Sequence, residues 1–124
     1  MKRGRAALLI AVVVAVLAGP ASALAYTDNG SVRFTSGRAC SGCTVTIHNV
    51  TTGANGSTTS NSSGSWSAGG FVAGYTYQVW ANYYLGSCSY ASTDYVQWGQ
   101  QSFNMVIDTI HVSSTGNPAG CPTF

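Results

Sequence analysis

The alternation of side chains between Tyr75 and Tyr84 constrains the fold more than any other part of the sequence. Residues two apart on a β-strand point to the same face, and neighbouring residues point to opposite faces. One face of this stretch is apolar and predicts a surface turned toward a core: Tyr75, Tyr77, Val79, Ala81 and Tyr83. The opposite face sets large rings among polar side chains: Thr76, Gln78, Trp80, Asn82 and Tyr84. We therefore expect a strand with one buried face and one exposed face.

Glycine-rich turns frame the segment before this strand. A turn at Asn61–Gly64 predicts the start of a short strand whose large apolar residue is Trp66. Gly69–Gly70 is expected to end that strand and Gly74 to form the next turn, because glycine adopts turn conformations that other residues avoid. Phe71, between these glycines, is expected to point back into the core.

The rest of the chain shows the same pattern of short strands. The stretch Thr52–Gly56 predicts a hairpin connection, because its Asn-Gly pair is a strong signal for one. The polar stretch after it predicts an edge strand. No window outside the N-terminal apolar run has the three-and-four spacing of a helix. We expect further strands at Ser31–Thr35, Cys43–Val50, Ser57–Ser60 and Gln101–Val112, a long loop at Gly86–Gln101 and a tail from Ser113. Short strands with frequent turns predict an all-β fold, a single small antiparallel β-sandwich of about seven strands.

The N-terminus has the composition of a secretory signal peptide. Basic residues in the first five positions precede an apolar run at Ala6–Ala18, and small residues follow at Ala23–Ala25. Such a run is short for a membrane span, and the small residues suit cleavage by a signal peptidase. The alternative is an uncleaved membrane anchor. We expect a signal peptide over residues 1–25 and a secreted, extracellular domain over residues 26–124, with no membrane association after cleavage.

Charge excludes nucleic acid as a partner. Cleavage after Ala25 leaves Arg33 and Arg38 as the basic residues, against three aspartates at positions 28, 94 and 108. Nucleic-acid binding depends on neutralising phosphates with lysine and arginine. Two arginines are too few for that role.

The four cysteines are Cys40, Cys43, Cys88 and Cys121. An even number in a small exported chain predicts two disulfides and leaves three connectivities open. The turn between the first two allows a local Cys40–Cys43 bridge, and Cys88–Cys121 would then fix the tail. A redox motif would need a helix N-terminus to lower the thiol pKa, and a zinc site would need more closely spaced ligands. We therefore expect disulfides and no metal.

Catalytic patterns are absent from the sequence. No Gly-x-Ser-x-Gly motif is present, and His48 and His111 both fall within expected strands. The chain has no glutamate, which excludes a glutamate pair for glycoside cleavage and a His-Glu zinc-protease motif. We expect a protein that is not an enzyme and that uses no cofactor.

Four short motifs resemble the carboxypeptidase regulatory-like domain. They are Gly37-Arg-Ala-Cys-Ser-Gly-Cys-Thr-Val-Thr-Ile47, Thr51-Thr-Gly53, Asn61-Ser-Ser-Gly-Ser-Trp66 and Ala73-Gly-Tyr-Thr-Tyr-Gln-Val-Trp-Ala81. That family has a transthyretin-like β-sandwich and is grouped with carbohydrate-binding-like folds. The resemblance covers Val32 to Tyr83 and the last strand. It implies a non-catalytic domain with a core that includes Val45, Ile47, Trp66, Phe71, Tyr77 and Val79.

The leading functional hypothesis is a binding or adhesion module for a carbohydrate or a cell-surface polymer. Trp80 and Tyr84 lie on the exposed face of their strand, roughly 13 Å apart. Aromatic faces can stack on the C–H surface of sugar rings, and the amides of Gln78 and Asn82 could hydrogen-bond the hydroxyls. These four residues form the predicted ligand site.

Two other functions fit the same sequence. A small disulfide-bonded inhibitor of a secreted hydrolase would present the long loop with Tyr90, Tyr95 and Trp98, braced by Cys88. A structural protein of the cell surface is the further alternative. In either case the partner would be a secreted or cell-surface protein. Which of the aromatic residues are exposed to solvent distinguishes the carbohydrate-binding hypothesis from the inhibitor hypothesis.

Overall fold

The computed structural model describes residues 25–99, 103–114 and 116–124, and the predicted signal peptide lies outside this part except for Ala25. The described residues form strands and no helix, which confirms the predicted all-β class. Accordingly, they contain no helix of the length and hydrophobicity needed to cross a membrane. The strands are β1 (Ala25–Phe34), β2 (Thr44–Asn49), β3 (Asn55–Thr59), β4 (Ser65–Val72), β5 (Tyr77–Leu85), β6 (Cys88–Ser92), β7 (Val96–Trp98), β8 (Met105–Val106) and β9 (Ile110–Ser114).

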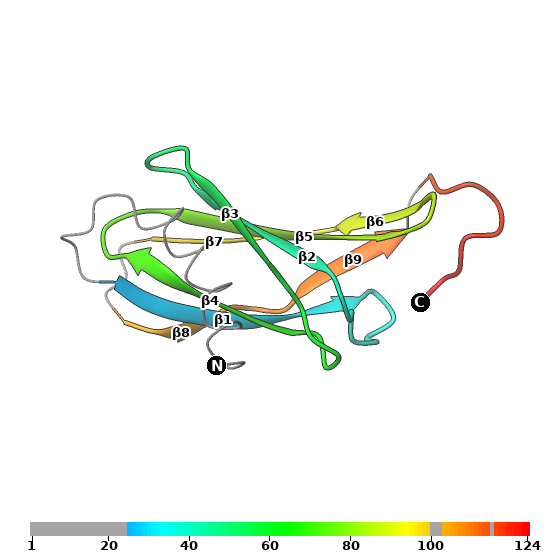
Figure 1. Ribbon diagram of the computed structural model, residues 1–124, viewed down its shortest axis with the longest axis horizontal. Coiled ribbons are helices and arrows are strands. Elements are labelled where there is room, and N and C mark those ends of the chain that lie inside the picture. The colour runs from blue at the N-terminus through cyan, green and yellow to red at the C-terminus, as the bar shows by residue number, and fades with distance from the viewer. Residues whose placement is uncertain (1–24, 100–102, 115) are drawn as a thin grey trace, which may run out of the picture.

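The strands follow one another in the order β3-β2-β5-β6-β9-β1-β4, with β7 paired to β5 and β8 paired to β1. Figure 1 shows β1, β4 and β8 in one layer and β5, β6 and β7 in the other, while β9 rises from the first layer to the second. The first half of β1 pairs with β4 and β8, and its second half pairs with β9. Strand β1 therefore joins the two layers of the sandwich.

Most pairings are antiparallel, as the sequence predicts, but β1 has two parallel neighbours. Val32 pairs with Ile110 of β9, and Asp28 pairs with Met105 of β8. Parallel pairing requires a crossover between strands that lie far apart in the sequence. Here the whole chain from β2 to β7 forms that crossover.

The predicted register of β5 is confirmed. Tyr77, Val79 and Ala81 are buried, the side chains between them are only partly buried, and Tyr84 is exposed. All six core residues implied by the family resemblance are buried: Val45, Ile47, Trp66, Phe71, Tyr77 and Val79.

The prediction that Gly69–Gly70 ends its strand is wrong. Strand β4 runs through both glycines to Val72. Tyr26 pairs with Phe71 and Asp28 pairs with Ala68, so a step of two residues on β1 faces a step of three on β4. The extra residue makes a β-bulge, and Gly70 has the positive φ of 85° that such an irregularity uses. Phe71 is buried, as predicted.

Other predicted boundaries also differ from the structure. The stretch from Gly86 to Gln101 is not one long loop, because β6 and β7 form within it and pair with β5. The expected last strand divides into β8 and β9, and residues 100–102 lie outside the described part. The predicted hairpin is confirmed, because β2 and β3 pair antiparallel, but its turn is closed by Gly53 (φ 83°) and Asn55–Gly56 already begins β3. Strand β3 lies at the edge of the sheet, as predicted.

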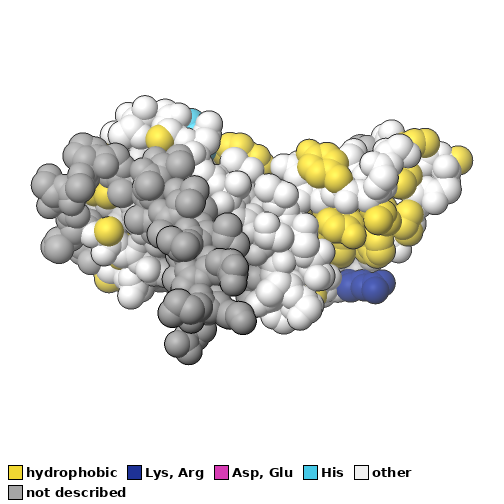
Figure 2. All heavy atoms as spheres, in the orientation of Figure 1, with side chains coloured by type: hydrophobic (Ala, Val, Ile, Leu, Met, Phe, Trp, Pro, Cys, Tyr) yellow, Lys and Arg dark blue, Asp and Glu magenta, His cyan; other side chains and the backbone are white. Residues whose placement is uncertain are grey.

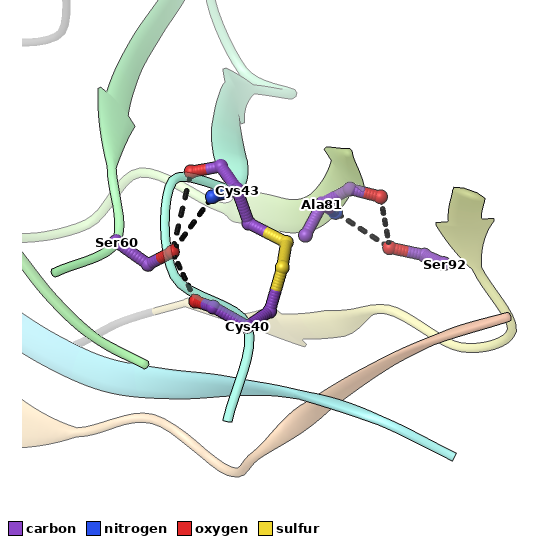
Figure 3. The surroundings of a disulfide bond; sticks show 5 residues. All are labelled: Cys40, Cys43, Ser60, Ala81 and Ser92. Carbon is purple, nitrogen blue, oxygen red and sulfur yellow. Dashed lines mark hydrogen bonds between the residues drawn. A yellow bond between two sulfur atoms is a disulfide. The ribbon is translucent and has the colours of Figure 1, made fainter. Parts of the chain in front are cut away.

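Both disulfides form in the favoured pairing, and the described residues include no free cysteine. Cys40–Cys43 is buried beside Ser60, whose hydroxyl accepts a hydrogen bond from the Cys43 N–H (2.9 Å) and donates one to the Cys40 carbonyl (2.6 Å) (Figure 3). Cys88–Cys121 is half-buried. It ties the C-terminal segment, residues 116–124, to β6.

The C-terminal segment packs through Phe124. The centroid of the Phe124 ring lies 4.7 Å from that of Phe34 and 5.4 Å from that of Tyr90, and Arg38 Cζ lies over the Phe124 ring at 5.5 Å from its centroid. Figure 2 shows hydrophobic side chains gathered beside a basic one at the end of the molecule where this segment lies.

Candidate functional site

A shallow pocket of about 290 Å³ opens on the outer face of β5. It contains three of the four residues of the predicted ligand site and one residue of the alternative loop site. Its lining residues are Gln78, Trp80, Asn82, Ala91, Ser92, Thr93, Asp94 and Tyr95.

An interruption in the pairing of β5 creates this pocket. Strands β6 and β7 both pair with β5, at Asn82↔Ala91 and Val79↔Val96, and the chain leaves the sheet between them. The Ser92 hydroxyl substitutes for the missing strand partner. It accepts a hydrogen bond from the Ala81 N–H (2.5 Å) and donates one to the Ala81 carbonyl (2.8 Å) (Figure 3). The backbone of β5 is therefore satisfied where the connection bulges outward.

The connection from Thr93 to Tyr95 is held against β9. The Thr93 N–H donates to the His111 carbonyl (2.9 Å), and the His111 N–H donates to Asp94 Oδ1 (3.0 Å). Asp94 Oδ2 also lies 3.3 Å from Nδ1 of the His111 ring. These bonds fix the wall of the pocket opposite Trp80.

Trp80 is the central aromatic side chain of the pocket and is partly buried. Its cross-strand partner on β2 is Thr46, and the ring of His48 lies 6.3 Å from its indole. Gln78 and Asn82 flank it on the same face of β5. Among the described residues, neither of these two amides has a hydrogen-bond partner in the protein, so both are available to a ligand.

The other predicted site residues fall into different environments. Tyr95 is exposed (58%) and lines the pocket, whereas Tyr84 is exposed (64%) but lies outside the lining. Tyr90 is buried, and its hydroxyl donates to the Pro122 carbonyl (2.6 Å). Trp98 packs against the core, 5.6 Å from Phe71.

The expectation of an exposed loop carrying Tyr90, Tyr95 and Trp98 is therefore wrong for two of the three. Pairing with β5 turns the side chain of Tyr90 inward from β6 and places Trp98 on β7 against the core. Only Tyr95 is exposed. The sequence analysis missed Ser92, Thr93 and Asp94, because no local pattern shows where the pairing of β5 is interrupted.

A second group of polar side chains is buried away from the pocket. Asp28 Oδ1 accepts a hydrogen bond from the Met105 N–H (3.0 Å), and Oδ2 has no partner among the described residues. Burial raises the pKa of Asp28 to about 6 and that of Tyr26 to about 12. These groups lie in the core between β1, β4 and β8. They contribute to the pH dependence of stability and not to the pocket.

Comparison with known proteins gives no family for the chain. No family model and no curated protein matches it, so the resemblance to the carboxypeptidase regulatory-like domain stays a prediction. Among solved structures, the chain is similar to the shaft pilin SpaA from Lactobacillus rhamnosus GG and to a double mutant of that pilin, with TM-scores of 0.48 and 0.47. The sequences are 12% identical, and the match covers 80% of this chain. It spans 48% of the pilin, about half of its length.

The described residues also contain no cluster of histidine, cysteine, aspartate or glutamate side chains that could hold a metal ion. His48 and His111 lie within β2 and β9, in agreement with their expected placement in strands.

Proposed function

We propose that the protein is an extracellular, non-catalytic binding module and that its pocket takes a sugar ring of a carbohydrate or cell-surface polymer. One observation carries the proposal: a partly buried indole, Trp80, lies in a shallow pocket between two amides that have no hydrogen-bond partner among the described residues.

The chemistry of the pocket suits a sugar. A pyranose ring presents axial C–H groups on its faces and hydroxyls around its edge. The Trp80 ring offers an apolar surface for the face, and Gln78 and Asn82 offer both donors and acceptors for the hydroxyls. Binding sites commonly combine an aromatic surface with a few placed polar groups in this way. Because the pocket is shallow, we expect dissociation constants from about micromolar to about millimolar.

The pocket lacks the groups that a glycoside hydrolase requires. Glycoside cleavage uses a pair of carboxylates on either side of the bond. Asp94 is the one carboxylate that lines the pocket, and both of its oxygens face His111. This arrangement supports binding without cleavage.

Calorimetric titration with soluble glucan, xylan, galactan and chitin oligosaccharides tests the proposal. We expect heat of binding for at least one of these glycans. We expect Trp80→Ala to weaken binding by about tenfold or more, because the indole supplies the main apolar surface of the pocket. Calorimetry is preferable to fluorescence here because Trp66 and Trp98 would contribute background emission. Gln78→Ala should also weaken binding, through the lost hydrogen bonds.

Tyr84→Ala serves as the matched control. Tyr84 is exposed on the same face but outside the pocket, roughly 13 Å from Trp80. Its loss should leave disaccharide binding unchanged and should weaken only oligosaccharides long enough to reach both rings. Absence of binding to every glycan would overturn the proposal. Inhibition of a secreted protease or amylase by the same protein would instead support the inhibitor function, with Tyr95 as the exposed contact.

A further inference from the structure

We propose that the pocket selects uncharged glycans and discriminates against glycans that carry carboxylate, sulfate or phosphate groups. This inference rests on the proposed function and adds the chemical class of its ligand. It follows from the placement of the few charges that remain in the chain after position 25.

No basic side chain lines the pocket. Arg38 lies over the ring of Phe124, beside the C-terminal segment. Arg33 is the cross-strand neighbour of His111 but does not line the pocket, and its guanidinium donates to the Gly37 carbonyl (2.8 Å). An anionic group in the pocket would therefore lose water without gaining a cationic partner, and such desolvation is costly.

The one carboxylate among the lining residues adds to this discrimination against anionic ligands. Asp94 lies in the wall between Thr93 and Tyr95 and is partly exposed. The His111 ring faces it on one side, and no arginine or lysine contacts it among the described residues. A second negative charge brought into this pocket would meet the Asp94 carboxylate at short range. Like-charge contact of this kind is an established way of rejecting wrong ligands.

The remaining polar groups of the lining match hydroxyls. Amide and hydroxyl side chains both donate and accept hydrogen bonds, as sugar hydroxyls do. Gln78 and Asn82 present such groups on either side of Trp80. The Thr93 hydroxyl donates to the His111 carbonyl (3.4 Å), so it offers a ligand only an acceptor. The Ser92 hydroxyl is already engaged with Ala81 and is not counted.

A galacturonan oligosaccharide and its carboxyl-reduced form test the inference, because they differ only in the oxidation state of one carbon of each sugar. A glucan oligosaccharide and its C6-oxidised form make a second pair. At an ionic strength of about 0.02 M, we expect the neutral member of a pair to bind about tenfold more tightly than the anionic member. The difference should shrink as salt screens the repulsion.

Asp94→Asn and Asp108→Asn form a matched pair of variants. Each removes one negative charge, but Asp108 is exposed and does not line the pocket. Asp94→Asn should lower the ratio of neutral to anionic affinity by at least about threefold, because it removes the negative charge while the amide oxygen can still accept the His111 N–H. Asp108→Asn should not change the ratio.

The outcomes separate the inference from the proposed function. Anionic oligosaccharides that bind as tightly as their neutral counterparts, or more tightly, would overturn the inference while leaving carbohydrate binding intact. The inference would also fail if Asp108→Asn changed the ratio as much as Asp94→Asn. No binding of any member of either pair would overturn the proposed function, and the inference with it.

Discussion

The indole ring of Trp66 lies so close to Gly30 that a Cβ atom at position 30 would stand 2.9 Å from Nε1 and 3.0 Å from Cε2. The two residues are direct partners in the pairing of β1 with β4. Trp66 is buried, and its ring fills the space that any other residue at position 30 would need for its side chain. Gly30 is thus required by packing, and not by a special backbone angle.

Gly30→Ala should therefore destabilise the fold. Inserting a methyl group into a packed core typically costs about 1–3 kcal/mol, and a rigid buried ring can move only with its neighbours. Urea denaturation of both proteins measures the loss. The same substitution in a Trp66→Phe background should cost less, because the smaller ring leaves room for the methyl group. Equal costs in the two backgrounds would show that the ring is not the cause.

The two tryptophans on opposite sides of the sheet should differ in their contribution to stability. Trp66→Ala removes a buried side chain and should cost about 3–5 kcal/mol. Trp80→Ala removes a partly exposed one and should cost much less. Thermal unfolding of the two variants makes the comparison, and similar losses of melting temperature would contradict the register of β5.

Asp28 predicts an unusual dependence of stability on pH. Burial raises its pKa from 3.8 to about 6 in the folded state, so ionisation is harder in the fold than in the unfolded chain. Its contribution is most favourable below the unfolded pKa and is lost as the pH rises through about 6. The loss should reach about 3 kcal/mol above that range.

Asp28→Asn removes this titration while keeping an acceptor for the Met105 N–H. The variant should be more stable than the wild type at pH values above about 7 and similar to it near pH 4. Denaturation curves across this range isolate the effect, since Asp94 and Asp108 are present in both proteins. A wild type that gains stability over the variant as the pH rises would contradict the prediction.

The two disulfides should differ in their rate of reduction. Cys40–Cys43 is fully buried, whereas Cys88–Cys121 is partly exposed. A limiting amount of dithiol should reduce Cys88–Cys121 first, and alkylation followed by mass spectrometry identifies the reacted cysteines. Replacing both Cys88 and Cys121 by serine should lower stability by about 2–4 kcal/mol through the loss of a cross-link. Earlier labelling of Cys40 and Cys43 would contradict the burial of their bridge.

The success of sequence-based prediction varied along the chain for physical reasons. The register of β5 follows from local alternation, because any arrangement that buries Tyr77 must also bury Val79. The strand that contains Tyr90 has no such signal. Its serines and tyrosines form a strand because the edge of β5 is available to pair with them, and that edge is a property of the folded sheet.

Only the part of the pocket formed by β5 could be predicted from the sequence, because only that part depends on local alternation. Gln78, Trp80 and Asn82 share a face of one strand, which the sequence shows directly. The opposite wall, Ser92 to Tyr95, is formed because β6 and β7 pair with different parts of β5 and the chain leaves the sheet between them. It is held by the hydrogen bonds between Asp94 and His111 on β9. Those contacts join residues that lie 17 positions apart, and no local pattern encodes them.

The parallel pairing of β1 with β9 determines when the protein can fold. The backbone of β1 at Val32 cannot pair with β9 until Ile110 has been synthesised, so the first strand becomes fully paired only after the last one has been made. The domain cannot assemble stepwise from its N-terminus as it leaves the ribosome. Chains dominated by such distant pairings fold slowly, in about milliseconds to seconds. We therefore expect the sandwich to be completed only after β9 has been made, so that an exported chain would cross the membrane before its fold is complete.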